Sequence, residues 1–255
     1  MAPVARTLTA ASRTLSAYVL CTLYALAAGP IGILLAMALD RPIILYRLGA
    51  AGNRLLLRVS GIRYRVEGPG QLLGRAAVYC FNHASNLEPP IAFLLLQPLF
   101  PRLRVVYKKS LRRLPILGRC FEIGGFIPID RRDREQSTRA LADAAQAMRD
   151  GNSFMMFPEG TRSRTGELLP FKKGAFVLAI DAQAPLVPVA IVGARRAMRR
   201  GSPFIWPVDD IVVRIGQPVE TAGATYDDRE RLMDEVRRSI TQMIGLSPKP
   251  AADSC

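Results

Sequence analysis

The chain divides into two parts that differ in the spacing of their apolar residues. Residues 14–39 form an apolar run without a charged side chain, and residues 43–60 carry apolar and basic residues at helical spacing. From residue 62 onward, short apolar runs alternate with longer amphipathic segments. This order predicts two N-terminal helices followed by an α/β domain, whose mixed, largely parallel sheet is flanked by helices.

The first apolar run is long enough to cross a bilayer as one helix, because a helix rises about 1.5 Å per residue. Gly29-Pro30 lies inside the run and predicts an interruption into one long and one short helix. A signal peptide is the alternative, since residues 25–27 resemble a cleavage site. The apolar run continues well past that site, so we predict a membrane-associated helical hairpin over residues 1–60.

The basic residues of the second helix lie on one side. On a helical wheel Arg47, Arg54 and Arg58 fall within about 40° of one another, while the leucines point in other directions. This arrangement is typical of an interfacial helix, with arginines toward lipid headgroups and leucines toward acyl chains. A helix packed on the core, with a solvated basic side, is the alternative.

The remaining elements follow from the same patterns. Short apolar runs predict strands over residues 62–66, 76–81, 103–107, 126–129, 153–157, 186–192 and 211–215. Amphipathic segments predict helices over residues 134–150, 174–182 and 227–244. We therefore expect an α/β domain over residues 61–246 and a disordered tail over residues 247–255.

The charge balance favours an anionic partner. Lys and Arg number 35 against 21 for Asp and Glu, which gives a net charge of +14. No zinc-ligand spacing, aromatic RNA-binding signature or helix-turn-helix pattern supports nucleic acid as that partner, so an anionic membrane surface and phosphorylated substrates remain. The four cysteines have no paired spacing and are typical of reduced thiols in an intracellular protein.

His83 is the only histidine of the chain and the one ordinary candidate for a neutral proton acceptor near pH 7. It follows one predicted strand and precedes a helix that begins at Glu88. In a continuous helix these two residues would lie about 500° apart, so they meet only if the loop folds back on the helix N-terminus. The carboxylate would then accept one imidazole N–H and leave the other nitrogen as a base. A helix-capping acid beside an unrelated histidine is the alternative.

Residues 157–163 lie at the carboxyl end of a predicted strand, where α/β sheets place their ligands. Gly160 permits close approach of the backbone, and Arg162 offers a planar fork suited to phosphate oxygens. Lys172 follows nearby in sequence. Another predicted strand, which follows Gly125, ends in Arg131. Taken singly, Arg131 is better explained as a solvated charge in a loop.

Four segments together resemble, in order, the sequence blocks of the 1-acylglycerol-3-phosphate acyltransferase family. They are Asn82-His83 with Glu88, residues 125–131, residues 157–163 and residues 185–189, and the resemblance covers roughly residues 62–217. It implies transfer of a fatty acyl group from a coenzyme A or acyl-carrier-protein thioester to the sn-2 hydroxyl of 1-acylglycerol 3-phosphate, giving phosphatidic acid. It implies no metal and no cofactor besides this co-substrate.

The resemblance also implies a role for individual residues. His83 would be the general base and Glu88 would orient it, although the family usually has aspartate at the position of Glu88. The acceptor's phosphate would be bound by Arg131 and Arg162 with Glu159, Gly160 and Thr161. Asn82, Gly125, Lys172 and Pro188 would support the site, and Asn82 or nearby backbone amides could stabilise the oxyanion.

Three further expectations complete this interpretation. The protein would associate with an anionic membrane surface on the cytoplasmic face, which is the inner membrane in a bacterium. Its partners would be lysophosphatidic acid and an acyl thioester, with acyl-carrier protein as one carrier and without nucleic acid. The alternatives are another lysolipid or glycerol 3-phosphate as acceptor, or a non-catalytic membrane-binding member of the fold, which Glu88 in place of aspartate would suggest.

Overall fold

The α/β part of the chain is built on one seven-stranded sheet, with strand order β1-β7-β6-β2-β5-β3-β4. The computed structural model describes residues 3–68, 70–130, 132–208 and 210–246. All neighbouring strands pair in parallel except β6 and β7, which are antiparallel. The predicted mixed, largely parallel sheet is thus confirmed. The predicted tail over residues 247–255 lies outside the described residues.

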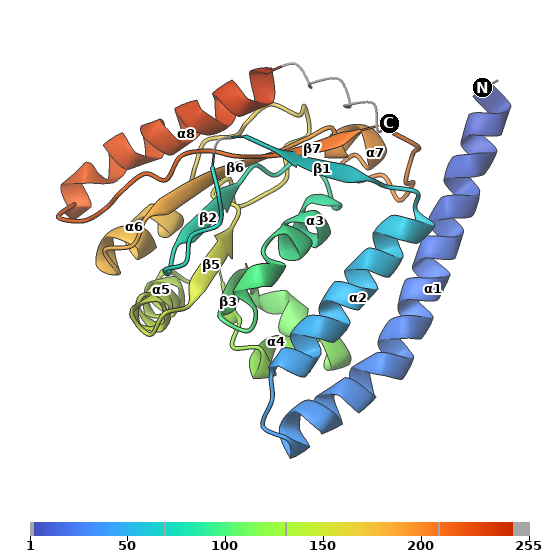
Figure 1. Cartoon of the computed structure of the whole chain (residues 1–255), viewed down its shortest axis with the longest axis horizontal. Helices are drawn as coiled ribbons and strands as arrows, with labels where there is room; N and C mark the ends of the chain where they lie inside the picture. Colours follow the sequence, from blue (N-terminus) through green and yellow to red (C-terminus); the bar gives the residue numbers. More distant parts are fainter. Residues whose placement is uncertain (1–2, 69, 131, 209, 247–255) are drawn as a thin grey trace.

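Each predicted strand is present with small shifts at its ends. The strands are β1 (Tyr64–Glu67), β2 (Val78–Phe81), β3 (Leu103–Lys108), β4 (Ile127–Ile129), β5 (Ser153–Met156), β6 (Leu186–Val192) and β7 (Ile211–Ile215). The central strand β2 is buried along its whole length, because helices cover both faces of the sheet (Figure 1). Continuous apolar runs in the sequence therefore correspond to central strands.

The helices confirm the predicted segments and add two that were not predicted, α4 and the short α7. They are α1 (Pro3–Ala38), α2 (Ile43–Val59), α3 (Glu88–Leu95), α4 (Pro115–Ile123), α5 (Arg134–Arg149), α6 (Gly174–Asp181), α7 (Ala194–Ala197) and α8 (Arg229–Gly245). Short 3-10 helices are η1 (Gln97–Leu99), η2 (Lys109–Arg113) and η3 (Tyr226–Asp228). Helix α4 was missed because it is short and contains Gly118, which lowers its helical signal.

Helix α1 corrects the predicted interruption at Gly29-Pro30. It is continuous, with Pro30 inside it, so the missing N–H of one proline does not end a helix this long. Gly29 serves a different purpose, because a Cβ there would overlap the side chain of Ile116. The glycine thus permits α4 to pack closely against α1.

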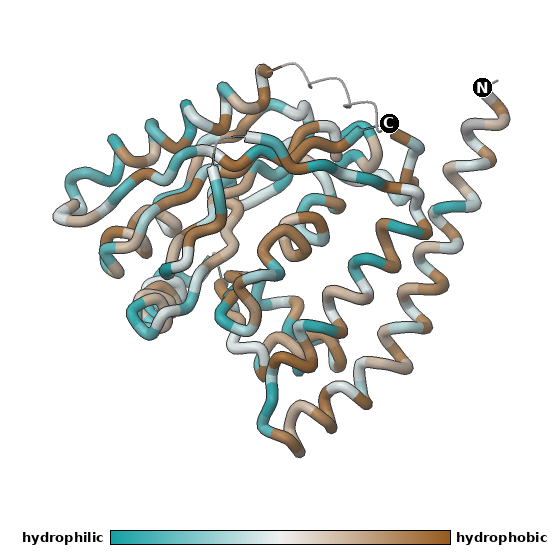
Figure 2. The backbone as a smooth tube through the Cα atoms, in the orientation of Figure 1, coloured by the Kyte–Doolittle hydropathy of each residue, from teal (hydrophilic) through white to brown (hydrophobic). Residues whose placement is uncertain are grey.

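Apolar side chains cover the outward side of α1. Leu23, Leu26, Ile31 and Leu34 are each more than half exposed. Figure 2 shows hydrophobic colours along most of this helix, whereas α8 alternates between hydrophobic and hydrophilic positions. By length and composition the segment Thr7–Ala38 is able to cross a membrane, with mean hydropathy 2.1. An exposed apolar surface of this extent supports association with a membrane.

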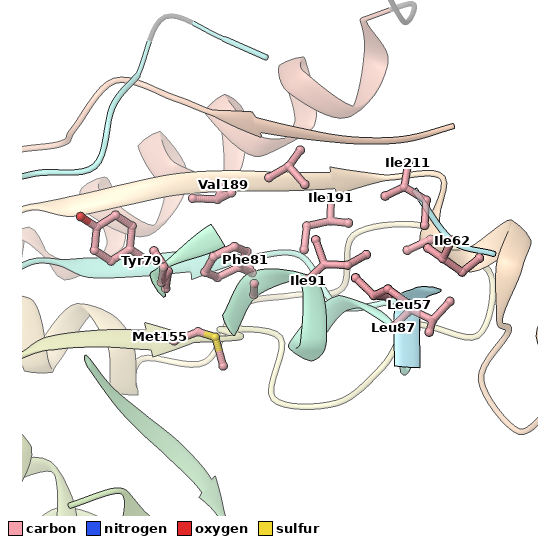
Figure 3. Packing of buried hydrophobic residues seen from close by; sticks show 14 of the residues in the cluster. Leu57, Ile62, Tyr79, Phe81, Leu87, Ile91, Met155, Val189, Ile191 and Ile211 are labelled. Atoms are coloured by element: carbon pink, nitrogen blue, oxygen red, sulfur yellow. The ribbon is translucent and has the colours of Figure 1, made fainter. Parts of the chain in front are cut away.

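Helix α2 belongs to the core of the α/β domain. Its Tyr46 and Leu57 are buried in the same apolar cluster as Phe81 and Ile91, and Figure 3 shows Leu57 beside Leu87. The Tyr46 hydroxyl lies within hydrogen-bond distance of the carbonyl oxygens of Leu103 and Gly124, which share its one proton. The predicted boundary at residue 60 therefore does not separate two independent cores.

The expected interfacial orientation of α2 is likewise corrected. Arg47, Arg54 and Arg58 are exposed as predicted, but Leu45 and Leu57 are buried and the other leucines of the helix are half-buried. The leucines pack on α1 and the sheet side of the domain, so the alternative interpretation of a core helix with a solvated basic side holds. Helical periodicity identifies an apolar side without specifying what covers it.

Candidate active site

The loop after β2 brings His83 and Glu88 into direct contact. The His83 Nδ1 atom lies 3.0 Å from Oε2 of Glu88, the first residue of α3. The same oxygen accepts the backbone N–H groups of Ala84 at 2.7 Å and Ser85 at 3.0 Å. The loop therefore folds back on the helix N-terminus, and Glu88 both closes the loop and holds the imidazole.

This contact determines which imidazole nitrogen is available as a base. A carboxylate accepts hydrogen bonds, so Nδ1 carries the proton and Nε2 keeps its lone pair. Burial raises the pKa of the Glu88 carboxyl, which is 1% exposed, and the hydrogen bonds from His83, Ser85 and Ala84 oppose this rise. The anionic form of Glu88 has three donors on one oxygen and thus a defined geometry.

Residues of the third block hold the backbone of His83 from both sides. Glu159 Oε1 accepts the His83 N–H at 2.5 Å, and Oε2 accepts the Leu169 N–H at 2.9 Å. The Ser163 N–H donates to the His83 carbonyl at 2.7 Å. The block that the sequence associates with phosphate therefore also positions the candidate base.

Glu159 does not occupy the phosphate-facing position predicted from the sequence. Its side chain is 2% exposed and directed at two backbone amides, and burial raises its pKa to about 7. A carboxylate in this place would also repel a phosphate. We therefore describe Glu159 as a positioning residue for His83.

The turn that follows Glu159 borders the site. Gly160 has a φ of +69°, a conformation that favours glycine, and its N–H donates to the Phe157 carbonyl at 2.9 Å. Thr161 is exposed beside it. The ring of Phe157 packs on the His83 imidazole, with 4.3 Å between centroids.

Arg162 lies beside the loop that carries His83. Its guanidinium donates to the Asn86 side chain, and its carbonyl accepts from Arg200 at 2.5 Å. Arg131 lies outside the described residues. The strands that precede these two arginines, β5 and β4, are separated by β3, so their ends lie about 10 Å apart at the usual strand spacing.

Asn82 and Pro188 have structural surroundings. The Asn82 amide donates to the Ile191 carbonyl at 3.0 Å and accepts the Ile191 N–H at 2.7 Å, so it joins the ends of β2 and β6 and is committed there. Pro188 is buried in β6 and packs toward Gly216 and α8. These two hydrogen bonds to β6 do not support the predicted oxyanion role of Asn82.

The last two predicted supporting residues differ in their relation to the site. Lys172 is exposed at the cavity described below, and its N–H donates to the Pro158 carbonyl at 2.7 Å. Gly125 has a φ of +69° in the turn between α4 and β4, where a Cβ would lie 2.8 Å from Nε of Arg104. Gly125 thus supports the fold next to β4.

A large cavity adjoins His83. Its volume is about 1560 Å³, which exceeds the roughly 300–1,000 Å³ of ordinary small-molecule sites. Its lining includes His83, Thr161 and Lys172, and the remainder is mainly apolar, contributed largely by α1, α2, α3, α4 and β3. Sequence reasoning missed this cavity, because its lining comes from segments that meet only after the helices pack.

These features are those of a candidate active site, in which a histidine held by a carboxylate adjoins a large, mainly apolar cavity. Residues 58–192 match the protein family described as Acyltransferase. The chain is 32% identical over 225 residues to the 1-acyl-sn-glycerol-3-phosphate acyltransferase of Limnanthes douglasii. The aligned region covers 86% of this chain and 78% of that relative. It is also 32% identical over 168 residues to the enzyme of the same name from Haemophilus influenzae, and the aligned region covers 66% of this chain and 67% of that enzyme.

A solved structure supports the same fold. The 1-acyl-sn-glycerophosphate (LPA) acyltransferase PlsC from Thermotoga maritima superposes with a TM-score of 0.77 at 22% identity, covering 96% of this chain and all of the other. The chain belongs to the acyltransferase family and, within it, to the group of 1-acyl-sn-glycerol-3-phosphate acyltransferases. The predicted family and its fold are thereby confirmed.

Proposed function

We propose that this protein transfers a fatty acyl group from a thioester to the sn-2 hydroxyl of 1-acylglycerol 3-phosphate and so forms phosphatidic acid. The observation that carries the proposal is the contact of 3.0 Å between His83 and Glu88 in the wall of a large apolar cavity. The names of the most similar relatives support the choice of acceptor. The intact contact also argues against a non-catalytic member of the fold, despite glutamate at the position of the usual aspartate.

The reaction needs a proton acceptor and a proton donor in turn. Nε2 of His83 takes the proton of the acceptor hydroxyl while the hydroxyl oxygen forms a bond to the carbonyl carbon of the thioester. The carbon–sulfur bond then breaks, and the leaving thiolate takes the proton back from the imidazolium. The products are an ester and a free thiol, and Glu88 stabilises the imidazolium between the two steps.

The two ends of the acceptor require different surroundings. Thr161 and Lys172 line the cavity and Arg162 lies beside the His83 loop, so we assign the phosphate to these residues, together with Arg131. The apolar lining would receive hydrocarbon chain. The cavity volume of about 1560 Å³ is suited to lipid-sized substrates.

The donor and the location form part of the proposal. Coenzyme A and acyl-carrier protein are both thioester carriers and would serve as co-substrates. We place the protein on the cytoplasmic face of a membrane, the inner membrane in a bacterium, because α1 exposes apolar side chains and the net charge of +14 favours an anionic surface.

Thiol release by the purified full chain tests the function. Acyl-coenzyme A and acyl-carrier protein would each be offered with 1-acylglycerol 3-phosphate, glycerol 3-phosphate and a lysophospholipid with a choline headgroup. We expect turnover with 1-acylglycerol 3-phosphate and none after His83→Ala. Turnover confined to another acceptor would refute the proposed substrate, and turnover that survives His83→Ala would refute the proposed base.

A further inference from the structure

The segment from Lys108 to Leu117 exposes leucines among basic residues. Leu111, Leu114 and Leu117 are 37%, 48% and 39% exposed. Lys108, Lys109, Arg112 and Arg113 lie between or beside them, all exposed, and the sequence has no acidic residue between positions 108 and 121. Exposed apolar side chains that are surrounded by positive charge are typical of a surface that meets a lipid headgroup region.

This surface continues the apolar side of α1. Helix α4 packs on the C-terminal half of α1, where the side chain of Ile116 lies against Gly29 and Arg119 approaches the sulfur of Met37 at 3.7 Å. The neighbouring part of α1 exposes Ile31 at 59% and Leu34 at 68%. The two apolar surfaces are therefore adjacent, although they come from distant parts of the sequence.

Part of the positive charge of this segment remains uncompensated within the protein. Arg112 pairs with Glu122 at 2.6 Å, and Lys109 has Asp130 at 3.9 Å. Lys108 and Arg113 have no ion-pair partner in the part of the chain that the structure describes. A basic side chain near an anionic leaflet contributes on the order of 1 kcal/mol, so charge complementarity favours a membrane over an uncharged partner.

The same leucines border the cavity. Leu111, Leu114 and Leu117 line it together with Leu26 of α1, which is 58% exposed. Residues that are both exposed and cavity-lining mark a place where the cavity opens to the surface. The lining of the same cavity also includes His83, Thr161 and Lys172, so the apolar opening and the polar site belong to one cavity.

We propose that Leu111, Leu114 and Leu117, with their basic neighbours, form a second membrane contact that adjoins α1 and sets the apolar opening of the cavity into the leaflet. A lipid substrate then passes from the leaflet into the cavity without crossing water. The contact itself is independent of the reaction, whereas the route of entry rests on the proposed function.

Two presentations of the acceptor test the route. The full chain would be compared with L111S/L114S/L117S, and with a control, V66S/Y226S/L246S, which replaces three apolar residues that are 51%, 53% and 59% exposed elsewhere on the domain. Acceptor would be supplied in vesicles of phosphatidylcholine and phosphatidylglycerol in equal parts, or as a short-chain, monomeric form in water. We expect the triple leucine variant to lose at least about tenfold more in rate with vesicles than with monomers, because three partly exposed leucines lose their burial in lipid. The control variant should match wild type with both.

Equal loss with both presentations would overturn the route of entry, since the leucines would then serve the site or the fold. Unchanged rates with both would overturn it as well. The contact has its own readout: in the Trp206→Phe background, Leu114→Trp should be quenched by brominated lipid in the same vesicles, and absence of quenching would overturn the contact. Quenching together with no turnover of either acceptor by wild type would support the contact and separately refute the proposed function.

Discussion

Shortening Glu88 by one methylene tests the geometry of the active site most directly. Glu88 Oε2 is 3.0 Å from His83 Nδ1, 2.7 Å from the Ala84 nitrogen and 3.0 Å from the Ser85 nitrogen. Glu88→Asp withdraws the carboxylate by about 1.3 to 1.5 Å, roughly one carbon–carbon bond. Each of the three distances then becomes about 4 Å, which is beyond hydrogen-bond range. The backbone cannot easily follow, because Leu87 and Ile91 on either side are buried in the core.

The expected magnitudes follow from these lost contacts. General-base catalysis contributes on the order of 10² to 10⁴ in rate, and an unoriented imidazole forfeits much of that contribution. We expect Glu88→Asp to lower kcat by on the order of 10² with little change in KM. Two buried backbone N–H groups also lose their acceptor, at about 1 to 3 kcal/mol each, so the variant should unfold more readily.

The assay is thiol release under saturating acceptor, with urea unfolding of the same samples. Glu88→Gln is the matched comparison, because it keeps the length and one acceptor oxygen but loses the charge. It should lower kcat more than it changes KM. In a His83→Ala background either change at Glu88 should cost little more, since the two residues act as one unit. A wild-type kcat for Glu88→Asp would refute the geometric argument, and a wild-type kcat for Glu88→Gln would reduce Glu88 to a helix cap.

Three further predictions concern the phosphate, the positioning acid and the membrane. Arg162→Lys keeps the charge but loses the planar fork, so it should raise the KM of the acceptor and leave the KM of the acyl donor unchanged. If only the KM of the donor changes, Arg162 binds the donor instead of the acceptor phosphate. Burial raises the pKa of Glu159 from 4.5 to about 7, so between these two pH values the native state binds a proton that the unfolded state has lost. The free energy of unfolding should therefore fall as the pH rises from about 4.5 to about 7. Urea unfolding should show this fall in wild type and not in Glu159→Gln; parallel pH profiles would contradict it. Removal of residues 1–38 should reduce sedimentation of the protein with anionic vesicles. Removal of residues 1–60 is not used, because it would also take Tyr46 and Leu57 out of the core. If the protein without residues 1–38 sediments as well as the full chain, α1 is not the main membrane contact.

The fold was predictable from the sequence wherever one element has one dominant environment. Central strands such as β2 and β6 are buried on both faces, so their apolar runs identify them directly. Helix α2 was ambiguous, because the same periodicity serves a helix on a membrane and a helix on a core. Helix α4 gave a weak signal, and its importance arises only from packing on α1.

The candidate site divides in the same way. The contact between His83 and Glu88 could be predicted, because the short loop between β2 and α3 keeps these two residues close to each other in space. The environment of Glu159 could not, because an acid beside arginines in sequence suggests a phosphate site whichever way its side chain points. Only the tertiary structure reveals that it faces the His83 and Leu169 amides.

The two buried acids have a common consequence for the reaction. Glu88 holds the His83 side chain and Glu159 holds the His83 backbone, and Glu88 contributes to the raised pKa of Glu159 through charge repulsion. In the proposed mechanism His83 accepts the hydroxyl proton, and a positive charge then forms next to Glu88 and one peptide group away from Glu159. This charge offsets the repulsion between the acids at the moment when the acceptor oxygen needs to lose its proton. In this mechanism the arrangement would favour the charge distribution of the transition state over that of the resting enzyme, which is the condition for catalysis.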